Sequence, residues 1–148
     1  MLSFIDSAVE VAEADSYAEA RSWANWTGAD ALKQAALRRG QDFIAGAYNS
    51  RWSVQFENDD APDEVKFAII EAARRELVSP GSINPDFDPT GTIKRERKEV
   101  GPLKKETEYA TPATAVASRP AFAAIEALLA GLVSAAAGGT SVSTLARF

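Results

Sequence analysis

Apolar residues recur at helical spacing in four segments of this 148-residue chain. The second and third segments, at about 30–48 and 62–78, show this pattern most clearly. Pro62, Asp63 and Glu64 are typical of a helix start, because proline fits the first turn and carboxylates stabilise the positive end of the helix dipole. Stretches rich in proline, glycine and asparagine separate the segments. The pattern predicts a mainly α fold, in the form of a small four-helix bundle.

The other two predicted helices are shorter. Asp15 and Ser16 are typical helix-starting residues, and the apolar spacing after them predicts a helix over about 16–26. Similar spacing near the C-terminus predicts the last helix over about 120–136. Inside the second helix, Gly40 either permits close packing or introduces a kink, and both interpretations stay open. The predicted core consists of Tyr17, Trp23, Leu37, Phe43, Ile44, Phe67, Ile69, Leu77, Ile125 and Leu129.

The chain contains neither cysteine nor histidine. This composition excludes thiol nucleophiles and thiolate metal sites, and it removes the most usual general base and metal ligand. The sequence also lacks a glycine-rich phosphate loop and a nucleophile-elbow motif. We therefore expect no enzymatic activity, no metal and no cofactor. No apolar run reaches the roughly 18 residues that span a bilayer, so we expect no membrane partner.

The net charge of −5 is unevenly distributed along the chain. Residues 1–92 carry 8 basic and 16 acidic side chains, whereas residues 93–109 carry 6 basic and 4 acidic ones. An acidic body repels nucleic acid at long range and suits docking onto a protein of opposite charge. The basic doublet Arg74-Arg75 is expected to pair with nearby acids such as Glu71. The large aromatic residues are expected in the core or at its edge rather than as platforms for bases; they are Trp23, Trp26, Tyr48 and Trp52.

The segment 93–109 (IKRERKEVGPLKKETEY) is densely charged and has Gly101 and Pro102 at its centre. It suits a disordered linker, a nucleic-acid contact or a β-hairpin. As a nucleic-acid contact it offers six cations, but four interleaved acids weaken its field, and Tyr109 is its only aromatic residue. As a hairpin it gains roughly 0.2–1 kcal/mol from each pair of opposite charges across the strands. Because neither face is apolar enough to bury, we favour a projecting hairpin that contacts other chains.

The candidate partner-binding residues come from this hairpin and from an extended C-terminal tail, the arm at 138–148. In the hairpin they are Arg95, Arg97, Lys98, Val100, Leu103, Lys104, Lys105 and Tyr109. In the arm they are Leu145, Arg147 and Phe148, with the phenyl ring as the anchor. All belong to one predicted domain, 1–148, whose helical body spans about 13–79 and 119–136.

The order of the segments along the chain resembles that of a known family. The segments are VAEADSYAEARSW (11–23), AALRRGQDFIAGAY (35–48), APDEVKFAIIEAARREL (61–77), IKRERKEVGPLKKETEY (93–109) and RPAFAAIEALLAGL (119–132). Together they resemble the head–tail adaptor proteins of tailed bacteriophages, which are also called connector or head completion proteins. Relatives in the same group are sometimes labelled DnaT-like single-stranded-DNA-binding proteins.

The resemblance implies a structural virion protein that has no catalytic residues. Such a protein forms a ring, usually dodecameric, between the portal and a tail-side stopper or terminator protein at the head–tail junction. DNA passes through the ring and contacts it only non-specifically. The protein is made in the cytoplasm of a host bacterium. The expected partners are therefore further copies of the chain, the portal and the tail-side protein, reached by the hairpin and the arm. The alternative is a single-stranded-DNA-binding protein that uses residues 93–109 and nearby aromatic side chains.

Overall fold

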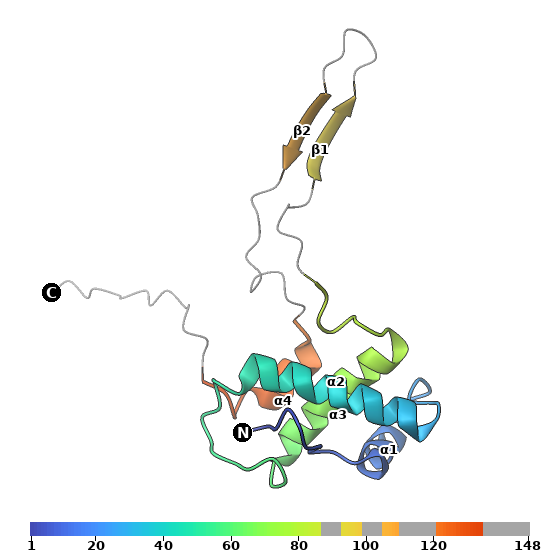
Figure 1. The fold of residues 1–148 in the computed structure, drawn as a ribbon, viewed down its shortest axis with the longest axis vertical. Helices are drawn as coiled ribbons and strands as arrows, with labels where there is room; N and C mark the ends of the chain where they lie inside the picture. The colour runs from blue at the N-terminus through green and yellow to red at the C-terminus, as the bar shows by residue number, and fades with distance from the viewer. Residues whose placement is uncertain (87–92, 99–104, 110–120, 135–148) are drawn as a thin grey trace, which may run out of the picture. The chain divides into compact units, whose positions relative to one another are not determined.

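The computed structural model describes residues 1–86, 93–98, 105–109 and 121–134, and for the two short segments it describes the backbone alone. These residues form a mainly α fold (Figure 1). Its elements are α1 (Val11–Ala20), α2 (Asp30–Tyr48), α3 (Asp63–Val78), β1 (Ile93–Lys98), β2 (Lys105–Tyr109) and α4 (Ala123–Leu129). The prediction of four helices is therefore confirmed, and α2 and α3 match their predicted bounds to within one residue. None of the described helices combines the length and the apolar character needed to cross a lipid bilayer.

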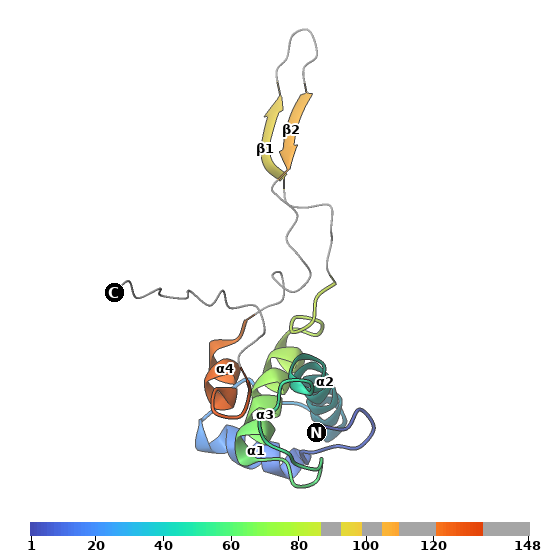
Figure 2. The same cartoon turned by 90° about the vertical axis from the view of Figure 1, so that its left-hand side faces the viewer.

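The chain divides into two compact units. The helical unit comprises Met1–Ile83 and Phe122–Phe148, and the second unit comprises Asn84–Ala121. Within the helical unit, α3 packs against α1, α2 and α4, and Figure 2 shows it between α2 and α4. Buried side chains on several sides of α3 agree with this central position; they include Val65, Ala68, Ile69, Ile70, Ala72 and Ala73.

Gly40 allows α2 and α3 to approach closely. A Cβ atom at Gly40 would lie 2.7 Å from the carbonyl oxygen of Ile69 and 2.9 Å from the backbone nitrogen of Ala73. Because both of these atoms belong to the backbone of α3, they cannot move aside as a flexible side chain can. The helix α2 continues without interruption through Gly40. Of the two interpretations of this glycine, close packing is therefore the one that the structure shows.

The N-terminal segment is held against α2 by a buried amide. The side chain of Gln41 is 1% exposed. Its Nε2 donates to the carbonyl oxygens of Ser3 and Asp6, at 2.6 and 2.8 Å, and its Oε1 accepts from the backbone nitrogen of Ala8 at 2.8 Å. These bonds accompany the burial of Leu2, which belongs to the core. No periodic apolar pattern marks this segment, so its burial does not follow from the sequence.

The helix α1 begins earlier than predicted. It starts at Val11, after Glu10, whose backbone is extended. Asp15 lies inside this helix, and its carboxylate accepts hydrogen bonds from the side chains of Trp26 and Lys33. The predicted start at residue 16 is therefore wrong: this acid joins α1 to α2 instead of capping α1.

The helix α4 is shorter than the predicted helix over 120–136. After α4, the backbone pairs with the connection between α2 and α3. The amide of Ser134 donates to the carbonyl oxygen of Arg51 at 2.8 Å, and Trp52 forms an isolated β-bridge with Val133. Backbone N–H and C=O groups that would form hydrogen bonds within a longer helix are thus bonded to another segment.

The core largely follows the prediction. Of the predicted residues, Tyr17, Leu37, Ile44, Ile69, Ile125 and Leu129 are buried. Partly buried and packed against them are Trp23, Phe43, Phe67 and Leu77. Trp26 and Tyr48 are also buried, and Trp52 lies at the edge, as expected for large aromatic residues.

The second unit contains β1 and β2, which pair in antiparallel orientation. Arg97 lies opposite Glu106 and Lys98 opposite Lys105, and the register shifts between Ile93 and Arg95. The side chains of both strands lie outside the described residues. The projection of a hairpin from the helical body and the extended C-terminal tail stay predictions.

Candidate functional site

The end of α1 turns Trp23 back onto the helix. Ser22 has a positive φ of 51°. Its amide donates to the carbonyl oxygen of Glu19 at 2.9 Å, and the amide of Trp23 donates to that of Ala18 at 3.1 Å. These two bonds around a left-handed residue form a Schellman motif. The motif ends the helix, which is why the predicted end at residue 26 is wrong, and it places the indole beside the last turn of α1.

Three aromatic rings and two arginines meet where α1 contacts α3. We call Tyr17, Arg21, Trp23, Phe67 and Arg74 the aromatic–arginine cluster. The ring centre of Tyr17 lies 5.4 Å from that of Trp23 and 4.7 Å from that of Phe67. The guanidinium carbon of Arg21 lies 3.3 Å from the centre of the Tyr17 ring, and that of Arg74 lies 4.2 Å from the centre of the Trp23 ring. Both distances are typical of cation–π contacts.

The two arginines of the cluster differ in their acidic partners. Arg74 lies 3.6 Å from Oε2 of Glu71, which also pairs with Arg75 at 2.8 Å. The predicted pairing of this basic doublet with Glu71 is therefore confirmed. Arg21 is exposed, and within the described ranges no acidic side chain forms an ion pair with it. Its charge is thus available to an anionic partner.

The phenol of Tyr17 stays neutral near physiological pH. Burial raises its pKa, the Glu71 carboxylate adds to the rise, and the charges of Arg21 and Arg74 oppose it. The ring therefore serves as an uncharged, electron-rich face on which the Arg21 guanidinium stacks.

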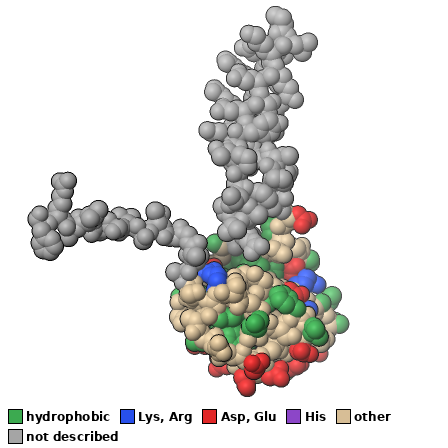
Figure 3. All heavy atoms as spheres, turned by 60° about the vertical axis from the view of Figure 1, so that its left-hand side comes forward, with side chains coloured by type: hydrophobic (Ala, Val, Ile, Leu, Met, Phe, Trp, Pro, Cys, Tyr) green, Lys and Arg blue, Asp and Glu red, His purple; other side chains and the backbone are tan. Residues whose placement is uncertain are grey.

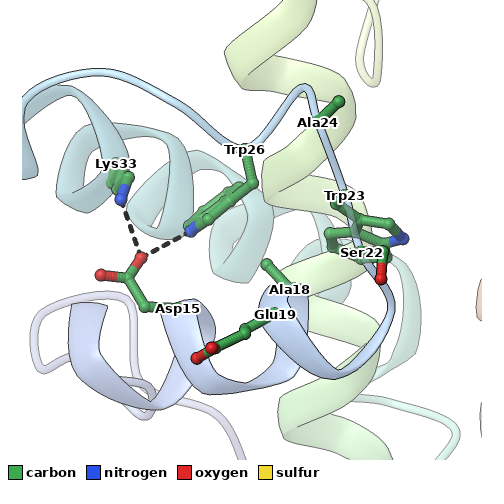
Figure 4. Close-up of a pocket in the computed structure, with 8 residues that line it drawn as sticks. All are labelled: Asp15, Ala18, Glu19, Ser22, Trp23, Ala24, Trp26 and Lys33. Atoms are coloured by element: carbon green, nitrogen blue, oxygen red, sulfur yellow. Dashed lines mark hydrogen bonds and ion pairs between the residues drawn. The ribbon is translucent and has the colours of Figure 1, made fainter.

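A shallow pocket of about 420 Å³ adjoins the cluster, between the end of α1 and the start of α2 (Figure 4). We call it the indole pocket; its lining residues are Asp15, Ala18, Glu19, Ser22, Trp23, Ala24, Trp26 and Lys33. Oδ1 of Asp15 accepts from Nζ of Lys33 at 2.9 Å and from Nε1 of Trp26 at 2.7 Å. The pKa of Asp15 is lowered, most strongly by the hydrogen bond from Lys33 and next by that from Trp26. The pocket wall therefore carries an ionised carboxylate at neutral pH.

The structure does not describe the side chains that were predicted to bind partners. Val100, Leu103, Lys104, Leu145, Arg147 and Phe148 lie outside the described residues, and only the backbone is described at Arg95, Arg97, Lys98, Lys105 and Tyr109. In the described ranges, no group of three or more acidic, histidine or cysteine residues is arranged to hold a metal ion. The prediction of Trp23 at the core edge is confirmed, but its contact with Arg74 was not predicted. No local pattern signals that contact, because the two side chains come from elements far apart in the sequence.

The fold and the site define a small helical protein in which aromatic rings and arginines meet where α1 contacts α3. Residues 50–147 match the family described as "Putative DnaT-like ssDNA binding protein". Because the match spans more than half of the sequence, the chain belongs to this family. Comparisons with curated proteins and with solved structures gave no match.

The family match corrects the resemblance to head–tail adaptors. That prediction is wrong, because the model that matches is of the DnaT-like family and not of an adaptor family. No comparison supports the predicted ring, or the portal and the stopper protein as partners. The family description instead suggests contact with DNA. The resemblance was based on the order of amphipathic helices around a charged segment. The virion location was inferred from that resemblance alone, and no comparison tests it.

Proposed function

We propose that this protein binds single-stranded DNA and has no enzymatic activity. Proteins that bind single strands combine cationic groups for the phosphates with aromatic side chains on which bases stack. The aromatic–arginine cluster brings both kinds of group together on one surface. The description of the family to which the chain belongs supports the same ligand.

The observation that carries the proposal is the position of Arg21. Its guanidinium lies 3.3 Å from the Tyr17 ring centre, and its Nη1 donates to the carbonyl oxygen of Tyr17 at 3.3 Å. Stacking holds the plane of the guanidinium while its other N–H groups stay available, and this geometry suits a phosphate. The half-buried Trp23 ring lies next to Tyr17. A base stacked on such a ring contributes roughly 1–3 kcal/mol.

Local contacts, and not the overall charge, must provide the attraction. Residues 1–92 carry twice as many acidic as basic side chains, and Figure 3 shows Asp and Glu side chains gathered at the lower edge of the helical unit in that view. Such a surface repels DNA at long range. A single strand exposes base faces to the cluster, whereas in a duplex the bases are stacked on one another. We therefore expect the protein to prefer single strands to duplexes.

The segment 93–109 is proposed to add contacts to the phosphates. It lies within the range that matches the family and has six basic residues: Lys94, Arg95, Arg97, Lys98, Lys104 and Lys105. Tyr109 adds one aromatic ring at its end. Arg147, near the C-terminus, is one more cation of the matched range.

A fluorescence-anisotropy titration of labelled oligothymidylate tests the proposal. Arg21→Ala should weaken binding several-fold and reduce the slope of log affinity against log salt by about 0.7, the value for one phosphate contact to a single strand. The matched control is Arg38→Ala, because Arg38 pairs with Asp42 on α2 and lies outside the cluster; this variant should bind as the wild type does. An unlabelled duplex should compete poorly. Absence of saturable binding at low salt would reject the function, and equal losses from both variants would reject the cluster as its site.

A further inference from the structure

The indole pocket has a chemistry that the aromatic–arginine cluster lacks. Among its lining side chains, Asp15 and Glu19 bring two carboxylates, whereas Lys33 brings one ammonium. The pocket surroundings are therefore negative overall, which disfavours a phosphate. The volume of about 420 Å³ falls in the range of small-molecule pockets, roughly 300–1,000 Å³. The pocket has room for a flat, uncharged group such as a nucleobase.

The two carboxylates of the pocket, Asp15 and Glu19, differ in the hydrogen bonds and ion pairs that they already form. Oδ1 of Asp15 accepts two hydrogen bonds, from Trp26 and Lys33. Glu19 is exposed, and in the part of the chain that the structure describes its carboxylate forms no ion pair. The side chains between and around them are small at Ala18, Ser22 and Ala24. A ligand in this pocket thus meets a hydrogen-bond acceptor at Glu19 and must present donors to it.

Resting on the proposed function, we propose that the indole pocket takes one unstacked base of the bound strand and prefers guanine. Guanine presents the N1–H and N2–H₂ donors side by side, which fits the two oxygens of one carboxylate. Adenine and cytosine present an amino group beside a ring acceptor, and thymine presents one N–H between two carbonyl oxygens that a carboxylate repels. Sequence-specific contacts of this kind use the Watson–Crick edges of unstacked bases. The cluster then holds the backbone and the neighbouring base, because Trp23 belongs to both surfaces.

The test uses oligothymidylate in which the central residue is replaced by dG, by dA or by deoxyinosine, whose base has N1–H but lacks the N2 amino group. Affinities are measured by anisotropy, and entry of a base is followed by quenching of tryptophan fluorescence. The strand with dG should bind about tenfold more tightly than oligothymidylate, since a bidentate contact discriminates by roughly this factor or more. The deoxyinosine strand should fall between them. Glu19→Gln should abolish the preference for dG without weakening binding of oligothymidylate, and the exposed control Glu57→Gln should leave the preference intact.

The outcomes separate this inference from the function on which it rests. Equal affinity for all four strands, or a dG preference that survives Glu19→Gln, would overturn the guanine pocket while single-stranded-DNA binding stands. Failure of every strand to bind would overturn the proposed function itself. A dG preference that is lost only in Glu19→Gln supports the inference.

Discussion

The guanidinium carbon of Arg74 lies 4.2 Å from the centre of the Trp23 ring. Arg74 belongs to α3, within residues 50–147 that match the family model, whereas Trp23 follows α1 and lies outside that range. The aromatic–arginine cluster is therefore completed by residues that the family match does not cover. A fragment limited to the matched region would lack Tyr17, Arg21 and Trp23, and with them most of the proposed contact surface.

Trp23 should contribute to DNA binding through its ring. Trp23→Ala should weaken binding of oligothymidylate by about tenfold, because stacking of one base contributes roughly 1–3 kcal/mol. Trp23→Phe, which keeps an aromatic face, should retain most of the affinity. Anisotropy titrations measure both variants, and thermal melts verify that both are folded. A loss from Trp23→Phe as large as that from Trp23→Ala would contradict a role in stacking.

Two glycines of α2 should respond in opposite ways to a methyl group. Gly40→Ala should destabilise the fold by about 1–3 kcal/mol, because the added Cβ meets the backbone of α3. Gly46→Ala should stabilise it by roughly 0.5–1 kcal/mol, since a Cβ there meets nothing within 4 Å and alanine favours the helix. Urea unfolding followed by circular dichroism measures both free energies. A neutral Gly40→Ala would contradict the close contact of α2 with α3.

Asp15 should make the stability of the fold depend on pH in the acid range. Its pKa is lowered in the folded protein by the hydrogen bonds from Lys33 and Trp26, so its contribution is present above the unfolded value of 3.8 and is lost as the pH falls through the folded pKa. Because the side chain is 44% exposed, we expect at most about 1 kcal/mol. Urea midpoints from neutral pH down to about pH 3 should fall more steeply for the wild type than for Asp15→Asn. Parallel curves for the two proteins would show that this pairing adds no stability.

Tyr48 should make the stability of the fold depend on pH in the alkaline range. Its hydroxyl donates to Oε1 of Glu126 at 2.6 Å, which joins α2 to α4. Burial, together with this carboxylate, raises the pKa of Tyr48 above its ordinary value of 10.0, so its contribution to stability is complete below that pH and is lost as the pH rises further. Tyr48→Phe should cost about 1–2 kcal/mol at neutral pH. The difference in urea midpoint between this variant and the wild type should shrink above about pH 10; a constant difference would mean that the hydroxyl does not titrate with unfolding.

The sequence was sufficient for the central helices but not for the helix ends that shape the site. The bounds of α2 and α3 followed from apolar spacing and from the turn at Pro62, which are local signals. The end of α1 depends on the left-handed backbone of Ser22, which no residue type demanded. Its start at Val11 precedes Asp15, whose carboxylate binds side chains of a later segment instead of capping the helix. Such contacts form only when distant segments pack, so periodicity does not predict them.

The candidate site shows the same limit. The rings of Tyr17, Trp23 and Phe67 were predicted as core or core edge, and the structure confirms this. Their pairing with Arg21 and Arg74 was not predicted, because the members come from α1, the turn after it and α3. The charged segment 93–109 was predicted to contact other chains. Its cations and Tyr109 are proposed to assist DNA binding.

Photo-crosslinking of bromodeoxyuridine-substituted single strands to the full-length protein tests the central claim most directly. After irradiation of the saturated complex, mass spectrometry identifies the peptides that carry nucleotides. The account predicts crosslinks at Trp23 or Phe67, the two partly exposed rings of the cluster, and their loss in Arg21→Ala at the same DNA concentration. Saturable binding with crosslinks confined to residues outside the aromatic–arginine cluster would contradict it.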